Sequence, residues 1–318
     1  MLNLIKPQRL RKGDKVAAVS LSWGGAGDAD LRWRYDLGKK RLEEQFGLEV
    51  VEMPHTLKGS EYLYKHPEKR AEDFMKAFSD PSIKAIFSCI GGEESIRMLP
   101  YIDFNIIRNN PKIFIGYSDS TIAHFMCIKG NLSSFYGPSI GNIPAADMWT
   151  SERIEWLEKN KNIAKTMKAN QEYEFIQGSG KVQGRLIGGC IEVLEMMKGT
   201  SLWPSIDAFK NSVLFFETSE DMPEPTYIEY WLRNYGSQGI LQNARAILWG
   251  KPYQGKYYEE YKDAIIKVVI NELGLTDFPI IYNMTFGHNQ PMMCLPYGAL
   301  AEINCDKQTF SILESGVI

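Results

Sequence analysis

The chain has 318 residues, of which 44% are hydrophobic and 24% are charged, a balance typical of a soluble globular protein with one large core or two medium ones. Its formal net charge of −3 and its pI near 5.9 give no electrostatic attraction to nucleic acid or to an anionic membrane. The amino terminus lacks the apolar core of a signal peptide, and no stretch approaches the roughly 20 apolar residues of a membrane span, so we expect a cytoplasmic protein.

The cysteines exclude two common classes of small-domain scaffold. None of the five forms a Cys-x-x-Cys pair, and they are scattered through apolar runs. This pattern indicates reduced thiols in the core rather than a zinc site or a disulfide framework. The five are Cys89, Cys127, Cys190, Cys294 and Cys305.

Strand and helix patterns alternate from the start of the chain. An apolar run at 15–21 predicts a buried strand that ends in a glycine-rich loop at 23–27. Apolar residues with helical spacing follow over 30–46, where Gly47 stops the pattern, and 48–53 predicts the next strand. Together these segments predict a βαβ unit.

The same alternation continues through the next sixty residues. A helix is predicted at 67–79, a strand at 83–90, a helix start at 95–99 and a further strand at 112–115. Continuously apolar strands that alternate with helices are typical of a parallel sheet covered on both faces. We therefore expect the functional residues at the carboxyl ends of the strands.

Beyond about residue 142 the texture of the sequence changes. A charged stretch at 151–168 predicts a helix, and 172–180 is interpreted as the connection between two domains. The second half carries strand and helix patterns in a looser order, which predicts a mixed α/β or α+β domain. Strands are expected at 212–216, 244–248 and 278–282, helices at 224–235 and 261–273, and a hairpin after 292.

The segment from Phe114 to His124 has the layout of a nucleophile elbow. Ser118 stands two residues after Gly116, directly after an apolar strand and directly before a helical pattern. Such a turn lifts the hydroxyl clear of the sheet and directs the backbone N–H of Asp119 at the reacting carbonyl. Ser120 replaces the second glycine of the usual Gly-x-Ser-x-Gly pattern, so an ordinary helix cap is the alternative interpretation.

The chain offers four histidines as a base for this serine. His124 follows Ser118 by nearly two helical turns and cannot reach back to the hydroxyl. His55 and His66 stand beside prolines in loops, where a solvated role is expected. His288 lies in a polar, glycine-containing loop after an apolar strand, which makes it the candidate base.

A base of this kind needs a carboxylate that orients the imidazole and stabilises its cation. Glu217 ends the apolar strand at 212–216 and is the candidate. Glu220 and Asp221 fall in the following loop, where a capping or surface role is expected. The alternative for Glu217 is a buried carboxylate satisfied by backbone donors.

Two glycine pairs at segment ends complete the candidate chemistry. Gly91 and Gly92 end a predicted strand, so the N–H of Gly92 is a candidate second donor to an oxyanion. Neither this pair nor the loop at 23–27 fits a dinucleotide fingerprint or a P-loop. Gly188 and Gly189 open another predicted helical run and either line the same cleft or only permit tight packing.

Six short motifs are spread over nearly the whole chain, and their order and spacing resemble those of the LD-carboxypeptidase family of serine peptidases. The Glu-Thr-Ser-Glu segment and the Phe-Gly-His ending are most similar to its microcin C immunity peptidase branch. The motifs are Lys12-Gly-Asp-Lys-Val-Ala17, Ile90-Gly-Gly92, Gly116-Tyr-Ser-Asp119, Gly184-Arg-Leu-Ile-Gly-Gly189, Phe216-Glu-Thr-Ser-Glu220 and Phe286-Gly-His288.

The resemblance implies an α/β protein with two domains that commonly forms a homodimer. It implies a flavodoxin-like parallel sheet with the nucleophile elbow at 1–168, and a mixed α/β (α+β) domain with acid and base at 169–318. It assigns Ser118 as nucleophile, His288 as general base and Glu217 as the orienting acid. The N–H groups of Gly92 and Asp119 become the oxyanion hole, and no metal or other cofactor is required.

The resemblance also implies a small peptide or peptidyl-nucleotide substrate. Members of the microcin branch cleave the amide that joins a carboxy-terminal aspartate to a nucleotide-like group, so we expect microcin C-like aminoacyl-nucleotide compounds. Trp149 is a candidate for stacking on the base, or else a core or interface residue, and Glu93 is a candidate ligand for an amine or a ribose hydroxyl. Hydrolysis of murein tetrapeptides, and small-ligand binding without catalysis, remain the alternatives.

Overall fold

A computed structural model describes residues 2–142, 166–168 and 173–318. The chain forms two compact units, which we call the N-terminal unit (4–160 with 316–318) and the C-terminal unit (161–315 with 1–3). The predicted domain boundary between residues 168 and 169 stays a prediction, because residues 169–172 lie outside the described part of the chain.

The N-terminal unit is built on a parallel sheet with the strand order β2-β1-β3-β4-β5. This is the order of flavodoxin-like folds. Strands β1, β3 and β4 are almost fully buried, as their continuous apolar character predicts, whereas the edge strand β2 is exposed at both of its ends. Their bounds are β1 Lys15–Val19, β2 Glu49–Glu52, β3 Ile83–Ser88, β4 Ile113–Gly116 and β5 Phe135–Tyr136.

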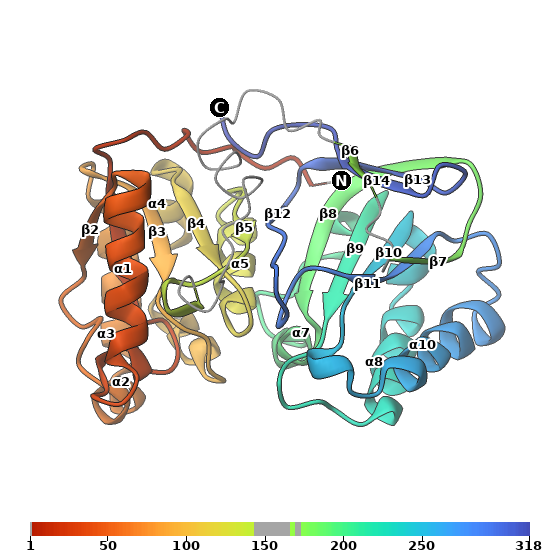
Figure 1. The fold of residues 1–318 in the computed structure, drawn as a ribbon, viewed down its shortest axis with the longest axis horizontal. Coiled ribbons are helices and arrows are strands. Elements are labelled where there is room, and N and C mark those ends of the chain that lie inside the picture. The colour runs from red at the N-terminus through yellow and green to blue at the C-terminus, as the bar shows by residue number, and fades with distance from the viewer. Residues whose placement is uncertain (1, 143–165, 169–172) are drawn as a thin grey trace. The chain divides into compact units, whose positions relative to one another are not determined.

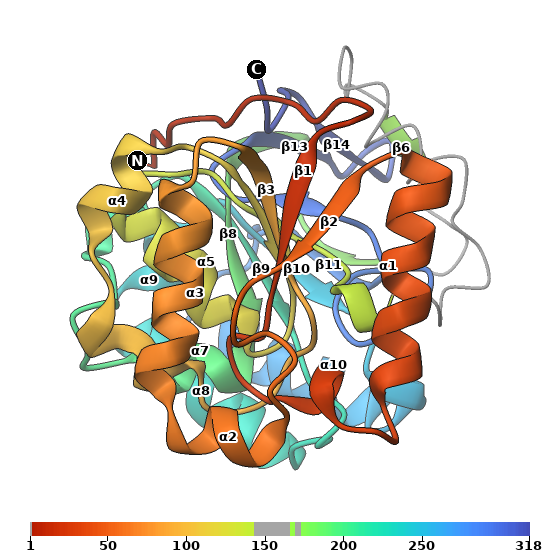
Figure 2. The same cartoon turned by 90° about the vertical axis from the view of Figure 1, so that its left-hand side faces the viewer.

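Helices cover both faces of this sheet, which confirms the predicted layering. Figure 2 shows α1 on one side of β1–β3, and α3 and α4 on the other. Helix α1 buries Leu42 and Phe46 and ends at Gly47, whose φ of 64° suits glycine. The helices are α1 Arg32–Phe46, α2 Ser60–Lys65, α3 Pro67–Ser79, α4 Phe104–Asn109 and α5 Ser120–Lys129.

Three short 3₁₀ helices join these elements. The helix start predicted at 95–99 is one of them, η2, at Ser95–Tyr101. It contains Pro100, which has no N–H to donate and so disfavours a longer α-helix. The other two are η1 Gly25–Gly27 and η3 Ile140–Asn142.

The C-terminal unit contains a mixed sheet of eight described strands in the order β6-β14-β13-β8-β9-β10-β11-β7 (Figure 1). The central strands β8 to β11 are parallel, and the flanking pairs are antiparallel. This confirms the predicted mixed domain. The strands are β6 Thr166–Lys168, β7 Glu174–Gln177, β8 Lys181–Cys190, β9 Ser212–Glu217, β10 Ala246–Gly250, β11 Ile280–Met284, β13 Leu300–Asn304 and β14 Thr309–Ile312.

One strand of this unit was missed and another was predicted as part of a helix. The long central strand β8 was not predicted, because its glycines indicate a turn rather than a strand. Gly188 lies opposite Phe215 of β9, and an added Cβ would stand 1.7 Å from the Phe215 carbonyl oxygen, so this glycine serves close backbone approach. Residues 166–168, predicted as the end of a helix, form β6, and the rest of that predicted helix lies outside the described residues.

Helices α8 and α10 pack against each other in the C-terminal unit (Figure 1). The helix predicted at 261–273 is divided, because the hydrogen-bond pattern changes from α to π after Ile265. The elements are α7 Ile191–Met197, α8 Pro225–Ser237, α9 Ile240–Asn243, α10 Tyr258–Ile265, the π-helix Ile266–Glu272, the 3₁₀ helices Ile206–Ala208 and Tyr253–Gly255, and the short strand β12 Leu295–Pro296.

The five cysteines are free thiols, and Cys89, Cys127 and Cys190 are buried in the core as predicted, whereas Cys294 and Cys305 are only partly buried. Within the described ranges, no helix is both long and apolar enough to cross a membrane.

Candidate active site

Ser118 occupies a sharp turn between β4 and α5 in the N-terminal unit. Its φ of 60° lies in the left-handed region, which is uncommon for a residue other than glycine. The Ser118 N–H donates to the hydroxyl of Tyr136 at 3.2 Å. An added Cβ at Gly116 would stand 2.6 Å from the Ser120 Oγ, so the glycine lets the helix approach the strand. The backbone therefore has the strained form of a nucleophile elbow.

The helix-cap interpretation of this turn is wrong. The residue at the N-cap of α5 is Asp119, and its side chain makes no capping bond. Ser118 instead accepts two hydrogen bonds at its carbonyl, from the Thr121 N–H at 2.9 Å and the Thr121 hydroxyl at 2.7 Å. These bonds hold the turn through the main chain and do not use the Ser118 side chain.

The turn after β3 lies directly beside Ser118. A Cβ at Gly91 would stand 3.0 Å from both the Cβ and the Oγ of Ser118. Gly92 has a φ of 137°, and a Cβ there would stand 2.4 Å from the Ser22 hydroxyl. Within the described part of the chain, the N–H groups of Gly92 and Asp119 donate to no other residue. Both amides stay available to a ligand oxygen.

A buried arginine underlies the same loops. The Arg70 side chain has no exposed surface, and its Nη1 donates to the carbonyls of Leu21 at 3.4 Å and Ser22 at 3.1 Å. Its Nη2 lies 3.4 Å from Glu94. Burial lowers the pKa of Arg70, while the charge of Glu94 opposes that shift. Arg70 thereby fixes the loop after β1 to the turn after β3.

Asp119 makes a second connection under this surface. Its Oδ2 accepts the Ser95 N–H at 2.8 Å, and the Ser95 hydroxyl donates to its carbonyl at 2.9 Å. Asp119 has no exposed surface. The start of α5 and the start of η2 are therefore fixed to each other, and the two candidate oxyanion donors belong to one rigid network.

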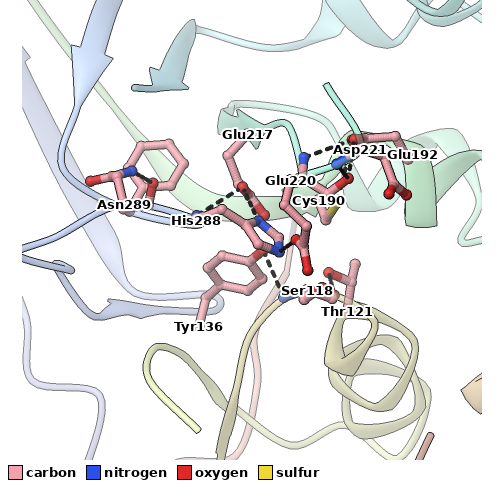
Figure 3. Close-up of polar contacts among 12 residues, drawn as sticks. Ser118, Thr121, Tyr136, Cys190, Glu192, Glu217, Glu220, Asp221, His288 and Asn289 are labelled. Carbon is pink, nitrogen blue, oxygen red and sulfur yellow. Dashed lines mark hydrogen bonds and ion pairs between the residues drawn. The ribbon is translucent and has the colours of Figure 1, made fainter. Parts of the chain in front are cut away.

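The C-terminal unit brings Glu217 and His288 together (Figure 3). Glu217 is the last residue of β9, and its Oε2 accepts the His288 Nδ1–H at 2.7 Å and the His288 N–H at 3.2 Å. The two side chains are 1% and 5% exposed. The pair fixes the proton on Nδ1 and leaves Nε2 for chemistry.

Two glycines make room for this pair. Gly287 has a φ of 84°, and a Cβ there would stand 2.4 Å from Cγ, Cδ and Oε2 of Glu217. A Cβ at Gly250 would stand 2.7 Å from the Glu217 Cβ. The glycine of Phe-Gly-His is thus required by the carboxylate that the histidine binds.

Glu220 is a site residue that the sequence analysis missed. Its Oε2 lies 2.8 Å from the His288 Nε2, although its side chain is 60% exposed (Figure 3). A surface role was expected because the loop is polar and rich in proline. The available signal was its place three residues after Glu217, in the loop that directly follows the same strand.

The electrostatics of this group favour a protonated imidazole. Burial by itself lowers the pKa of His288, but the charge and hydrogen bond of Glu217 and the contact with Glu220 outweigh it and raise that pKa to about 10. The hydrogen bond from His288 lowers the pKa of Glu220 to about 2, against the effect of burial. Resting His288 therefore carries a proton on Nε2 that faces Glu220.

The other histidines have structural contacts. His124 is buried between the Ser134 hydroxyl and the Gly116 carbonyl, each at 2.9 Å, and burial lowers its pKa to about 3. His66 contacts Glu68 at 2.9 Å and is half exposed. The prediction of a solvated His55 was wrong, because its side chain is 14% exposed and contacts Asp73 at 2.9 Å.

Only one of the two predicted substrate-binding residues lies in the described part of the chain. Glu93 is exposed beside Gly92, and Trp149 lies outside the described residues. Across residues 2–142, 166–168 and 173–318, no group of three or more His, Cys, Asp or Glu side chains has the arrangement of a metal site.

Comparison with known proteins finds similarity along both units. Residues 16–137 match the family described as the LD-carboxypeptidase N-terminal domain, and residues 183–303 match the LD-carboxypeptidase C-terminal domain. The chain is 29% identical to the microcin C7 self-immunity protein MccF of Escherichia coli, over 96% of this chain and 94% of that protein. It is also 29% identical to a protein of Bacillus subtilis named "Probable murein peptide carboxypeptidase", over 98% of this chain and 95% of that one.

A solved structure agrees with these matches. The MccF-like protein from Streptococcus pneumoniae in complex with AMP is similar to this chain with a TM-score of 0.83 and 28% identity, over 94% of this chain and 98% of that one.

Proposed function

Because this chain belongs to the LD-carboxypeptidase family and has both of its domains, we propose that its serine-peptidase chemistry uses Ser118, His288 and Glu217. The observation that carries the proposal is the 2.7 Å hydrogen bond between the His288 Nδ1 and the buried Glu217, which is the support a catalytic imidazole needs. The strained turn at Ser118 supports it independently, because it presents a serine hydroxyl at the carboxyl end of a parallel strand.

The mechanism follows from these roles. Neutral His288 accepts the Ser118 proton at Nε2 while the hydroxyl oxygen attacks the carbonyl carbon of the scissile amide. Glu217 stabilises the imidazolium, which then gives its proton to the leaving nitrogen as the C–N bond breaks. Water attacks the acyl-serine, His288 takes a proton from that water, and the acid is released with the Ser118 hydroxyl restored.

The N–H groups of Gly92 and Asp119 are the proposed oxyanion donors. Loss of one such donor costs about 3 kcal/mol, which corresponds to a hundredfold or more in rate. The network of Arg70, Ser95 and the Asp119 side chain holds the backbone that carries both amides. Preorganisation of this kind is what makes backbone donors effective.

The proposed substrates are microcin C-like aminoacyl-nucleotide compounds, cleaved at the amide after a carboxy-terminal acidic residue. The similarity to a self-immunity protein and to an MccF-like protein solved in complex with AMP supports an adenosine-bearing leaving group. The equal identity to the Bacillus subtilis protein favours one alternative, removal of the terminal D-amino acid from murein tetrapeptides.

The test is hydrolysis of aspartyl and glutamyl sulfamoyl adenosine by wild type and by Ser118→Ala, with products identified by mass spectrometry. The proposal expects the free amino acid and sulfamoyl adenosine from wild type, and at least about a thousandfold slower release from the variant. A murein tetrapeptide is the competing substrate. Turnover of the tetrapeptide alone would transfer the assignment to murein, and undiminished activity of Ser118→Ala would refute the nucleophile.

A further inference from the structure

The Nε2 atom of His288, which the proposed reaction needs as a proton acceptor, contacts Glu220 at 2.8 Å. We propose that Glu220 holds His288 in its resting form until an ammonium group on the acyl part of the substrate takes this carboxylate. Glu220 would then determine specificity for acyl residues with a free α-amino group. The inference rests on the proposed function and names the substrate feature that the same site recognises.

The loop that carries Glu220 is fixed on both sides of it. The Ser219 N–H and hydroxyl donate to Glu192 at 2.8 and 2.9 Å. The N–H groups of Asp221 and Met222 donate to the Ser219 hydroxyl and carbonyl, each at 3.2 Å. Release of His288 therefore requires a rotation of the Glu220 side chain and no movement of the main chain.

The two carboxylates on His288 differ in how firmly they are held. Glu217 is almost completely buried and receives two hydrogen bonds from His288, whereas the Glu220 side chain is 60% exposed. Water competes with the imidazolium for an exposed carboxylate, so the contact with Glu220 contributes less net stability than the buried contact with Glu217. Glu217 is therefore the permanent partner of the imidazole and Glu220 the exchangeable one.

The charges around His288 in this unit favour a cation. Glu217 and Glu220 contact the imidazole directly, and Glu192 lies near Glu217, as does the Cys190 thiol. Burial, and then the charge of Glu217, raise the pKa of Glu192. A substrate ammonium at Glu220 would complement this excess of acidic groups, while a carboxylate there would be repelled.

The position of Glu220 also fits the geometry of the reaction. The Ser118 oxygen must lie within hydrogen-bond reach of Nε2 and about 3 Å from the carbonyl carbon. An α-ammonium nitrogen is two bonds from that carbon, which brings it into the neighbourhood of a carboxylate that contacts Nε2. Acylation of the amine removes both the charge and two of its three protons, and with them this interaction.

Binding of the ammonium would have a second effect, on the base itself. Once Glu220 pairs with the substrate, the imidazolium loses one stabilising carboxylate and gains a nearby cation. Both changes lower the pKa of His288, so its Nε2 proton passes to solvent water and the lone pair becomes available. Recognition and activation of the base are then one event.

The experiment compares aspartyl sulfamoyl adenosine with its N-acetyl derivative in wild type, Glu220→Gln and Glu224→Gln. Glu224 is an exposed carboxylate on the same loop that does not contact His288, which makes it the matched control. We expect wild type and Glu224→Gln to prefer the free amine by about tenfold or more in kcat/KM, the size of one charge-assisted hydrogen bond. We expect Glu220→Gln to lose that preference.

A second measurement does not need turnover. NMR titration of His288 in a Ser118→Ala background should give a midpoint at least about one pH unit lower after the further change Glu220→Gln, because one stabilising carboxylate is removed. An unchanged midpoint, or an unchanged preference for the free amine in Glu220→Gln, would overturn the inference. Failure of the proposed function would look different, as no turnover of either compound by wild type while the titration still shows the shift.

Discussion

Gly287→Ala should disable the base without replacing any side chain that takes part in the reaction. The added methyl would stand 2.4 Å from three atoms of Glu217, whereas ordinary contact begins at 3.4 Å. Glu217 must therefore move by about 1 Å, the difference between those distances. A displacement of that size would lengthen its 2.7 Å hydrogen bond to His288 to about 3.7 Å, beyond hydrogen-bond range.

The expected loss of rate follows from that displacement. A misplacement of about 1 Å in a catalytic group costs about 100-fold, and loss of the orienting carboxylate costs up to about 10,000-fold. We expect kcat to fall within these limits while KM changes little, because the substrate-binding surface is not altered. The φ of 84° adds strain of about 1–2 kcal/mol to the free energy of folding, since alanine disfavours the left-handed region.

Gly274→Ala separates the two effects. Gly274 has a φ of 68° in the same unit, and a Cβ there would meet no atom within 4 Å, so this variant carries the backbone strain without the collision. Steady-state kinetics and urea unfolding of both variants make the comparison. If Gly287→Ala retains the kcat of Gly274→Ala, the Glu217–His288 hydrogen bond does not support catalysis.

Two further predictions concern the N-terminal unit. Arg70→Met removes the donor to two buried carbonyls and leaves Glu94 without its buried partner. The free energy of unfolding should therefore fall by about 3–5 kcal/mol, and kcat should fall more than KM rises. A change confined to stability would contradict the role of Arg70 in holding the oxyanion turn. Burial lowers the pKa of His124 from the ordinary 6.5 to about 3, so its contribution to stability is fully present above pH 6.5 and is lost progressively as the pH falls from 6.5 through about 3. The urea midpoint should therefore fall less between pH 7 and pH 4 in His124→Gln than in wild type. An equal decrease of the midpoint in the two proteins would show that another group causes the acid sensitivity.

The strands and helices of the N-terminal unit could be predicted because local pattern and burial coincide there. Helix α3 has the predicted bounds, and β1, β3 and β4 lie within or beside their predicted runs. A parallel strand covered on both faces is apolar throughout, so the sequence alone displays it. Strand β8 was missed because its glycines are needed for the close approach of β9, and this contact joins segments about thirty residues apart in the chain.

The candidate site divides in the same way. The Ser118 turn, the end of β9 at Glu217 and the loop at His288 each follow from short-range signals, since a strand end, a glycine and a polar loop are local features. What the sequence could not show is which groups meet. That Gly287 must lack a side chain for Glu217, and that Glu220 lies on the Nε2 of His288, depend on segments about seventy residues apart.

Composition and pattern alone determined the class of protein, the parallel sheet of the first half, and the residue types able to attack an amide. The tertiary structure decided how His288 is held and charged: with two carboxylates on one buried imidazole, the base rests protonated rather than ready. The physical reason is that a pKa depends on burial and on neighbouring charges, and neither is a property of a residue's place along the chain.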